Sequence, residues 1–239
     1  MSKEHFKSVY GLEKLTMLDY EMHLSAILFY GGCSIRCPYC YNKGIVFKEY
    51  PLINPSEIDA FVKSRTNKLD AIVFSGGECT IYGDSLYEDI IYCRSLGYKI
   101  KLDTNGTNFA LVERLLKENL VDYIALDYKC PVEKKNIFGF TDISYSNFKN
   151  TLELLCSASV PFEVRTTVHT DIIDEKDITN IIQDLDNYGY QGNYYIQFHF
   201  RNAPETIGNV NDMPREFDIS KIKNTKNIFI KYRNEQDNY

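Results

Sequence analysis

Six short segments that read as strands, separated by segments with helical spacing, limit the folds open to this chain more than any other feature of its sequence. Short apolar runs bounded by turn residues are typical of buried strands. Each gap leaves room for one crossover helix, and such alternation predicts a parallel sheet. We therefore expect an α/β fold, a partial (β/α)6 TIM-like barrel that is open on one side. The predicted strands are Leu24–Tyr30, Ala71–Phe74, Tyr98–Leu102, Tyr123–Leu126, Phe162–Val168 and Tyr194–Phe198.

Capping residues and apolar spacing mark the helices between these strands. Asn54 stands at an N-cap position, Pro55 follows at N1 and Glu57 at N3, which predicts a helix start. Between 178 and 185, four apolar residues recur at i, i+3, i+4 and i+7, the pattern of an amphipathic helix. Similar stripes predict helices around 86–93, 111–116 and 148–155.

The 239 residues are expected to form one domain, 1–239, because a barrel of this kind uses such a length as a single unit. It would consist of a lead-in at 1–22, the barrel core at 24–200 and a polar tail at 201–239. In that tail, Ile228–Ile230 is the one apolar cluster, and we expect a short surface strand or helix there.

Charge and composition exclude several classes of protein. The net charge is −6 and no basic stripe is present, which argues against a nucleic-acid partner. No apolar run approaches the roughly 18 residues of a membrane span, and the N-terminus lacks the apolar core of a signal peptide. Seven cysteines, three of them in one loop, suit metal binding in a reducing compartment better than a disulfide framework. We therefore expect a cytoplasmic protein.

The loop at 31–40 follows the first predicted strand and holds Cys33, Cys37 and Cys40 at the spacing C-x3-C-x2-C. Three thiolates on one tight loop can each hold one iron of a [4Fe–4S] cluster and leave the fourth iron open to a chelating ligand. A structural zinc site is a second reading, but zinc prefers four ligands and nothing nearby supplies the fourth. A third reading is three ordinary buried cysteines.

Polar residues follow the predicted strands at the end where β/α barrels carry their active sites. We expect these clusters to converge on one mouth. Gly76 and Gly77 have no Cβ, so their backbone can approach a ligand closely, and Glu78 offers a carboxylate to an ammonium group. The clusters are Ser75–Glu78, Asp103–Gly106, Asp127–Lys129, Arg165 and Gln197–His199.

The cysteine spacing, with Tyr39 before the last cysteine, resembles the signature of the radical S-adenosylmethionine (SAM) superfamily. The resemblance implies a [4Fe–4S] cluster on the three loop cysteines, with SAM chelated to the open iron through its amino and carboxylate groups. It implies reductive cleavage of SAM to a 5′-deoxyadenosyl radical. The similar Gly-Gly-Glu stretch implies that Gly76, Gly77 and Glu78 bind the methionine amino end of SAM. Tyr39 is likewise expected to be a cofactor-binding residue.

A narrower resemblance covers roughly residues 10–200 and points to the activating enzymes of glycyl radical enzymes. It is carried by Gly11–Tyr20, Leu102–Gly106, Asp122–Lys129 and Arg165–Val168. Within that group the chain is most similar to the activating proteins of anaerobic ribonucleoside-triphosphate reductases. This implies hydrogen abstraction from a glycine of a partner glycyl radical enzyme. It also implies a flavodoxin- or ferredoxin-like electron donor.

The same resemblance implies that Asp103, Lys129 and His199 contact polar groups of SAM. It also implies a monovalent cation site near Asp103, Thr104 and Asp127. From the residues alone, a lysine or histidine can offset a carboxylate, and carboxylates can accept hydroxyl hydrogens or bind a cation.

Two further candidates for cofactor binding are Asn105 and Arg165. Simpler roles stay open for several of these side chains. Lys129 could form a surface ion pair and His199 could be a packed histidine. Arg165 could simply pair with Asp127 or Glu163 inside the barrel.

Three positions depart from the pattern of the relatives. Cys79 replaces the usual proline after Gly-Gly-Glu, Cys130 replaces a small residue, and Tyr41 replaces a histidine after the third cysteine. Each extra cysteine is either a small buried residue or a redox-active thiol or added ligand. The departures bear on the substrate more than on the cofactor. Two rivals stay open: a radical SAM enzyme acting on a peptide or small molecule, and a non-enzymatic protein that binds metal or stores clusters. The second rival leaves Gly-Gly-Glu unexplained.

Overall fold

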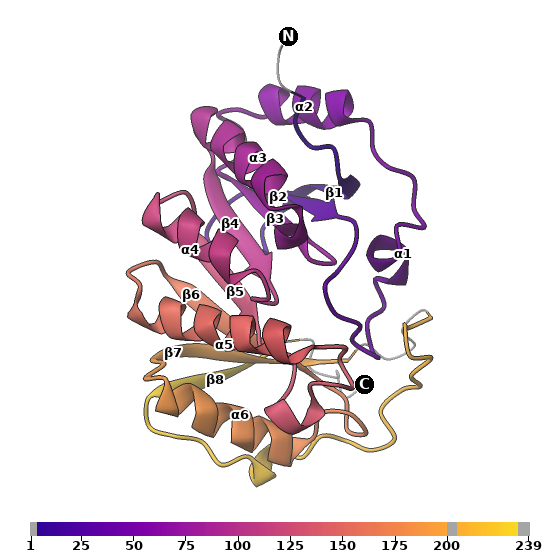
Figure 1. Cartoon of the computed structure of the whole chain (residues 1–239), viewed down its shortest axis with the longest axis vertical. Helices are drawn as coiled ribbons and strands as arrows, with labels where there is room; N and C mark the ends of the chain where they lie inside the picture. Colours follow the sequence, from indigo (N-terminus) through magenta and orange to yellow (C-terminus); the bar gives the residue numbers. More distant parts are fainter. Residues whose placement is uncertain (1–3, 200–204, 234–239) are drawn as a thin grey trace.

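The computed structural model describes residues 4–199 and 205–233. Eight strands form one sheet in the order β1 to β8, so each strand lies beside its neighbours in the sequence (Figure 1). β1 runs antiparallel to β2, and every later neighbouring pair is parallel. The strands are β1 (Val9–Thr16), β2 (Ser25–Tyr30), β3 (Ala71–Gly76), β4 (Lys99–Thr104), β5 (Tyr123–Asp127), β6 (Phe162–Val168), β7 (Gly192–Phe198) and β8 (Ile228–Arg233).

The connections between the parallel strands carry helices, which is why the sheet is parallel. In Figure 1, α3, α4, α5 and α6 line one side of the sheet, and α1 lies apart near the loop that follows β2. Within the described residues, β1 pairs only with β2 and β8 only with β7, so the barrel stays open between β1 and β8. The helices are α1 (Lys43–Val46), α2 (Pro55–Ser64), α3 (Asp84–Ser95), α4 (Phe109–Lys117), α5 (Asp142–Ser157) and α6 (Glu175–Asn187).

The predicted partial barrel is confirmed, and its six predicted strands correspond to β2 through β7. The bounds of Phe162–Val168 agree at both ends. The predicted start of α2 is also correct, because the side chain of Asn54 accepts a hydrogen bond from the Ser56 N–H at 3.0 Å. Within residues 4–199 and 205–233, no helix is long and apolar enough to cross a membrane.

The number of strands was predicted too low, because both edge strands lack a buried apolar run. The expected lead-in contains β1, which is mostly half-buried or exposed and carries charged Glu13 and Lys14. Its register with β2 shifts twice, a feature that blunts sheet edges. The apolar cluster at Ile228–Ile230 belongs to β8, which extends to Arg233 and pairs in parallel with β7.

The inner face of the sheet is apolar at β2 and β3 and charged from β4 onward. In the apolar part, Tyr20 packs against Ile27 of β2 and against Ala71 and Val73 of β3. From β4 onward, inward positions carry ionic side chains, and the parallel register places Asp127 beside Arg165. A charged interior is costly unless its groups pair, so this half of the barrel indicates a polar site.

Candidate active site

A cavity of about 300 Å³ lies at the carboxyl ends of the parallel strands. Its volume is at the lower end of the range for small-molecule sites. The predicted convergence is found for most candidates, whereas Glu78, Asp103 and Thr104 are outside its lining. The predicted residues that line it are Cys33, Cys37, Tyr39, Cys40, Gly76, Gly77, Asn105, Asp127, Lys129, Arg165 and His199.

The cysteine loop is held in shape by its own backbone and by Arg36. A guanidinium nitrogen of Arg36 donates to the carbonyl oxygens of Cys33 at 2.7 Å and Ile35 at 2.8 Å. The Arg36 N–H donates to the Phe138 carbonyl at 2.7 Å, which ties the loop to the chain after β5. All three loop cysteines consequently face one cavity.

Burial raises the pKa of the Cys33 thiol to about 11 and that of Cys37 to about 12. Bound cations are therefore needed to hold these sulfurs as thiolates near neutral pH. Three thiolates suit a cluster, in which each thiolate has its own iron, better than a zinc site, because zinc prefers four ligands.

Gly76 and Gly77 make room for protein backbone rather than only for a ligand. A Cβ on Gly76, whose φ is +130°, would lie 2.2 Å from the Tyr30 carbonyl oxygen. A Cβ on Gly77 would lie 2.1 Å from the carbonyl oxygen of Gly32. The Glu78 N–H donates to that same oxygen at 2.9 Å. Gly76 thus lets the end of β3 pack directly on the end of β2, and Gly77 lets it pack on the cysteine loop. Both residues also line the cavity.

The carboxylate of Glu78 is buried, with 1% of the residue exposed, and is occupied by donors of the protein. One oxygen accepts the Thr80 hydroxyl at 2.6 Å and the Thr104 hydroxyl at 2.8 Å. The other accepts the Asn105 N–H at 2.6 Å. Burial raises the pKa of Glu78, although these hydrogen bonds oppose the shift. The predicted contact of this carboxylate with a ligand ammonium is not seen, because its donors are Thr80, two residues on, and Thr104 and Asn105 at the end of β4.

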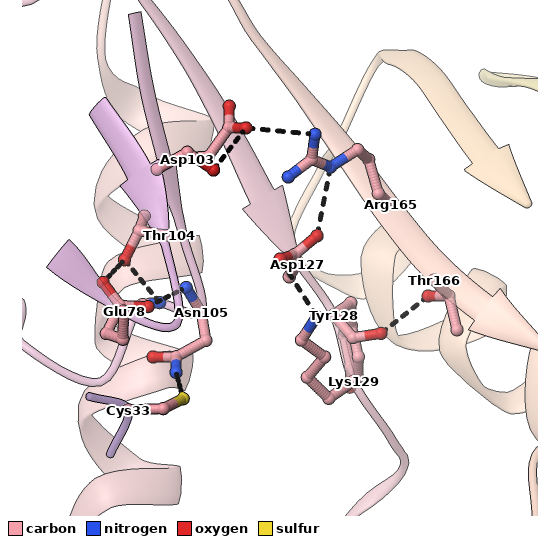
Figure 2. A network of polar contacts seen from close by, with 12 residues as sticks. Cys33, Glu78, Asp103, Thr104, Asn105, Asp127, Tyr128, Lys129, Arg165 and Thr166 are labelled. Atoms are coloured by element: carbon pink, nitrogen blue, oxygen red, sulfur yellow. Dashed lines mark hydrogen bonds and ion pairs between the residues drawn. The ribbon is translucent and has the colours of Figure 1, made fainter. Parts of the chain in front are cut away.

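Asp127 forms the centre of the charged wall (Figure 2). Its carboxylate lies 3.0 Å from Arg165 Nε and 3.0 Å from Lys129 Nζ. Burial opposes ionisation, but the two cations hold the pKa of Asp127 below its usual range. Despite burial, Asp127 raises the pKa of Lys129. All three groups are therefore charged near neutral pH.

Arg165 also approaches a second carboxylate, with 3.6 Å between a terminal nitrogen and Asp103 Oδ2. Lys101 Nζ lies 3.3 Å from the other oxygen of Asp103. Pairing of Arg165 with Asp127 is thus realised, whereas Glu163 pairs with Arg233 at 2.8 Å instead. The wall combines ionised groups of both signs, as recognition of a zwitterion requires.

Two polar atoms in the cavity wall, the Tyr39 hydroxyl and His199 Nε2, are buried without a hydrogen-bond partner among the described residues. Burial, reinforced by His169, lowers the pKa of His199, so its ring is neutral near pH 7. Unpaired buried polar groups cost free energy, and native proteins usually satisfy them with water or ligand. Together with the three cysteines and the charged wall, these atoms fit an iron–sulfur cluster beside a small zwitterion such as SAM.

A strap of irregular chain at 205–218 covers the cysteine loop. The N–H groups of Ile207 and Gly208 donate to the carbonyls of Cys40 at 3.1 Å and Pro38 at 2.8 Å. A Cβ on Gly208 would lie 2.9 Å from Pro38 Cβ, so this contact requires glycine. Ile207 lines the cavity, but the polar, Asn-rich sequence around it has no apolar periodicity from which this position could have been predicted.

The strap is anchored at its other end to the β6 and α6 region. His169 Nε2 lies 2.8 Å from the Asn211 carbonyl oxygen, which makes that nitrogen the donor. Arg215 forms two bonds to Glu175, at 2.6 and 2.7 Å. The sequence also missed Thr167, which lines the cavity two residues after Arg165 and could have been found from strand periodicity.

Cys79 and Cys130 are buried and lie outside the cavity lining. The Cys79 thiol donates to the Asp103 carbonyl oxygen at 3.7 Å. This arrangement agrees with small packed residues and gives no support to an added cluster ligand. Tyr41, the third departure, does line the cavity.

Comparison with known proteins gives the family. Residues 27–185 match the model of the Radical SAM superfamily. A Methanocaldococcus jannaschii protein, provisionally named a glycyl-radical enzyme activating enzyme, is 33% identical over 221 residues, covering 90% of this chain and 89% of its own. The pyruvate formate-lyase-activating enzyme of Clostridium pasteurianum is 22% identical, covering 75% of this chain and 77% of its own.

Solved structures agree on the fold. Streptococcus suis SuiB matches with a TM-score of 0.58 at 13% identity, covering 85% of this chain. The chain spans about half the length of that structure, 47%, so the likeness concerns the barrel alone. The sequence match, the cysteine cavity and the open barrel lead to one conclusion: the chain belongs to the radical SAM superfamily, in the group of glycyl-radical enzyme activating enzymes.

Proposed function

We propose that this chain generates a glycyl radical on a partner enzyme, an anaerobic ribonucleotide reductase. The observation that carries the proposal is the placement of Cys33, Cys37 and Cys40 in one cavity with the charged wall of Asp127, Lys129 and Arg165. The relationship to the archaeal and clostridial activating enzymes supports the reaction type. The reductase as partner is supported by the sequence resemblance alone.

In this proposal the three loop cysteines hold a [4Fe–4S] cluster as thiolates, and SAM binds beside it. When bound, the two groups supply one-electron reductive cleavage and hydrogen abstraction. Lys129 and Arg165 attract the carboxylate of SAM, since their positive charges reach the cavity. Asp127 keeps both cations in place through its two ion pairs.

The remaining predicted residues divide into two groups. Tyr39 and His199 each offer a buried, unpartnered polar atom to the ligand, and the backbone at Gly76 and Gly77 lines the same space. Glu78, Asp103 and Thr104 act by holding the strand ends together, because their side chains bond mainly to the protein. Removing the second group should therefore disturb the shape of the site more than direct contacts with SAM.

The predicted monovalent cation near Asp103, Thr104 and Asp127 fits this arrangement poorly. Arg165 and Lys101 already neutralise the carboxylate of Asp103. The Thr104 hydroxyl is buried outside the cavity lining, and its oxygen already accepts the Gly106 N–H at 3.0 Å. We leave the cation out of the proposal for this reason.

The opening between β1 and β8 suits a protein substrate, because a loop that carries the target glycine can enter from the side. An acceptable electron donor is a flavodoxin- or ferredoxin-like protein. All seven cysteines are free, as expected in a reducing compartment such as the cytoplasm. The donor and the compartment are parts of the proposal.

The test uses the full chain, purified without oxygen and reconstituted with iron and sulfide. Incubation with SAM and dithionite should yield 5′-deoxyadenosine. Cys37→Ala should lose this activity, whereas Cys156→Ala, which changes a cysteine outside the cavity, should keep it. A candidate anaerobic reductase should then acquire a glycyl radical signal in electron paramagnetic resonance.

Two outcomes overturn the proposal. If fully clustered protein fails to cleave SAM even with the reductase present, a binding or cluster-storage role replaces it. If SAM is cleaved but no glycyl radical forms on any encoded glycyl radical enzyme, a peptide or small molecule becomes the substrate. A gene for a precursor peptide beside this one favours that second outcome.

A further inference from the structure

We propose that Asn105 is a positioning residue for the cluster, and that its side-chain amide sets the reduction potential through a hydrogen bond to Cys33. The inference rests on the proposed ligation of the cluster by Cys33. Asn105 was predicted as a cofactor-binding residue from its place after β4. The structure places it in the cavity lining, and its hydrogen bonds run to the cysteine loop and to Glu78.

Asn105 is almost fully buried, with 2% exposed, and its orientation is fixed by its neighbours. The backbone N–H of Thr107, which can only donate, lies 3.1 Å from Oδ1. The Thr107 hydroxyl donates to the same oxygen at 2.7 Å. The amide oxygen must therefore face Thr107, and the amide nitrogen must face the opposite way.

That nitrogen points at the first cluster cysteine. Asn105 Nδ2 lies 3.0 Å from Ser34 Oγ and 3.9 Å from Cys33 Sγ, and Figure 2 shows the amide directed at the sulfur. The backbone of Asn105 is anchored separately, by its N–H bond to Glu78 at 2.6 Å. Glu78 thus acts on the cluster site indirectly, by holding the residue whose amide meets the sulfur.

Hydrogen bonds to ligating sulfurs help to set the reduction potential of an iron–sulfur cluster. A donor stabilises the reduced cluster more than the oxidised one, because the reduced cluster carries one more negative charge. The potential therefore rises when the bond is present. Asn105 is a neutral donor that keeps its hydrogens over the whole physiological pH range, so its effect does not depend on protonation.

The test compares the reconstituted wild-type chain with Asn105→Ala and with a matched control, Asn108→Ala. Asn108 belongs to the same loop, donates to the Thr80 carbonyl at 2.6 Å and accepts from the Leu111 N–H at 3.3 Å. Its substitution removes two side-chain hydrogen bonds, neither of which reaches the sulfur. The readout is the midpoint potential of the cluster, titrated without SAM and followed by electron paramagnetic resonance.

We expect a shift to more negative potential in Asn105→Ala and no shift in Asn108→Ala. A potential equal to wild type in Asn105→Ala overturns the inference. If wild-type chain takes up no cluster, the proposed function fails instead, so the two failures are distinguishable.

A second variant covers the case in which Asn105→Ala does not fold. Ser34→Ala removes an exposed hydroxyl that competes with the sulfur for the same amide hydrogens. Its potential should stay at the wild-type value or move in the positive direction. A negative shift in Ser34→Ala contradicts a bond from Asn105 to the sulfur.

Discussion

The rings of Tyr39 and His199 lie 6.3 Å apart in the wall of the cavity, and each carries a buried polar atom without a partner among the described residues. Both rings face the space beside the loop cysteines, and Tyr39 also packs edge-on against Phe138. A ligand that supplies partners to both atoms would recover the free energy that their burial costs.

Tyr39→Phe tests this relationship. Removing an unsatisfied buried hydroxyl should raise the free energy of unfolding of the cluster-free chain by about 1 kcal/mol. The same change should weaken SAM binding to the reconstituted chain, measured by equilibrium dialysis, because the ligand loses a partner. Tyr194→Phe is the control: its hydroxyl donates to Thr166 at 2.8 Å, so the loss should cost about 1 kcal/mol. Equal destabilisation by both changes would contradict the unpartnered state of Tyr39.

Gly77→Ala should displace the cysteine loop, because the new Cβ would lie 2.1 Å from the Gly32 carbonyl oxygen. We expect the free energy of unfolding to fall by about 2 kcal/mol and the iron content after reconstitution to drop severalfold. Gly189→Ala is a useful comparison, since Gly189 has φ of +72° and open space around its Cβ position. It should lose about 1 kcal/mol to backbone strain and keep its iron. Normal iron content in Gly77→Ala would refute the direct contact.

Gly208→Val should detach the strap from the cysteine loop, because its side chain would meet Pro38. We expect faster limited proteolysis within 205–218 and faster loss of cluster iron to a chelator. Glu216→Ala changes an exposed residue of the same strap and should leave both rates unchanged. If Gly208→Val releases iron at the wild-type rate, the strap has no part in holding the loop.

Glu175 gives the anchor of the strap a pH dependence. Its bonds to Arg215 lower the pKa from 4.5 to about 2 in the folded chain. A lowered folded pKa means that the stabilisation is fully present above the unfolded pKa and is lost as the pH falls toward 2. Wild type should therefore be more stable than Glu175→Gln near neutral pH, and the difference should shrink progressively between about pH 5 and pH 3. The free energy of unfolding of both proteins, measured in urea across this pH range, checks the prediction, with Glu216→Gln as control. A difference independent of pH would rule out ionisation of Glu175 as its source.

Local sequence was sufficient for the six central strands, because each carries either a continuous apolar run or apolar residues at alternate positions. It was equally sufficient for the cap at Asn54 and for the cysteine loop, whose chemistry lies in spacing along ten residues. The two edge strands were not predicted, because an edge strand is solvated and carries charged residues where a central strand carries buried apolar ones.

The partners of the site residues could not be read from the sequence. Glu78 accepts hydrogen bonds from Thr104 and Asn105, and Arg165 forms its ion pair with Asp127 and not with Glu163. Both outcomes depend on which side chains the sheet brings within hydrogen-bond distance, often from positions far apart in the chain.

By itself, then, the sequence determined the central parallel strands, the three-cysteine loop and the polar ends of the strands. Tertiary structure alone decided that Gly77 packs on the cysteine loop, that the Glu78 side chain lies outside the cavity lining, and that the polar tail returns over Pro38. The physical reason is that burial patterns are local, whereas hydrogen-bond satisfaction is settled only when distant strand ends meet.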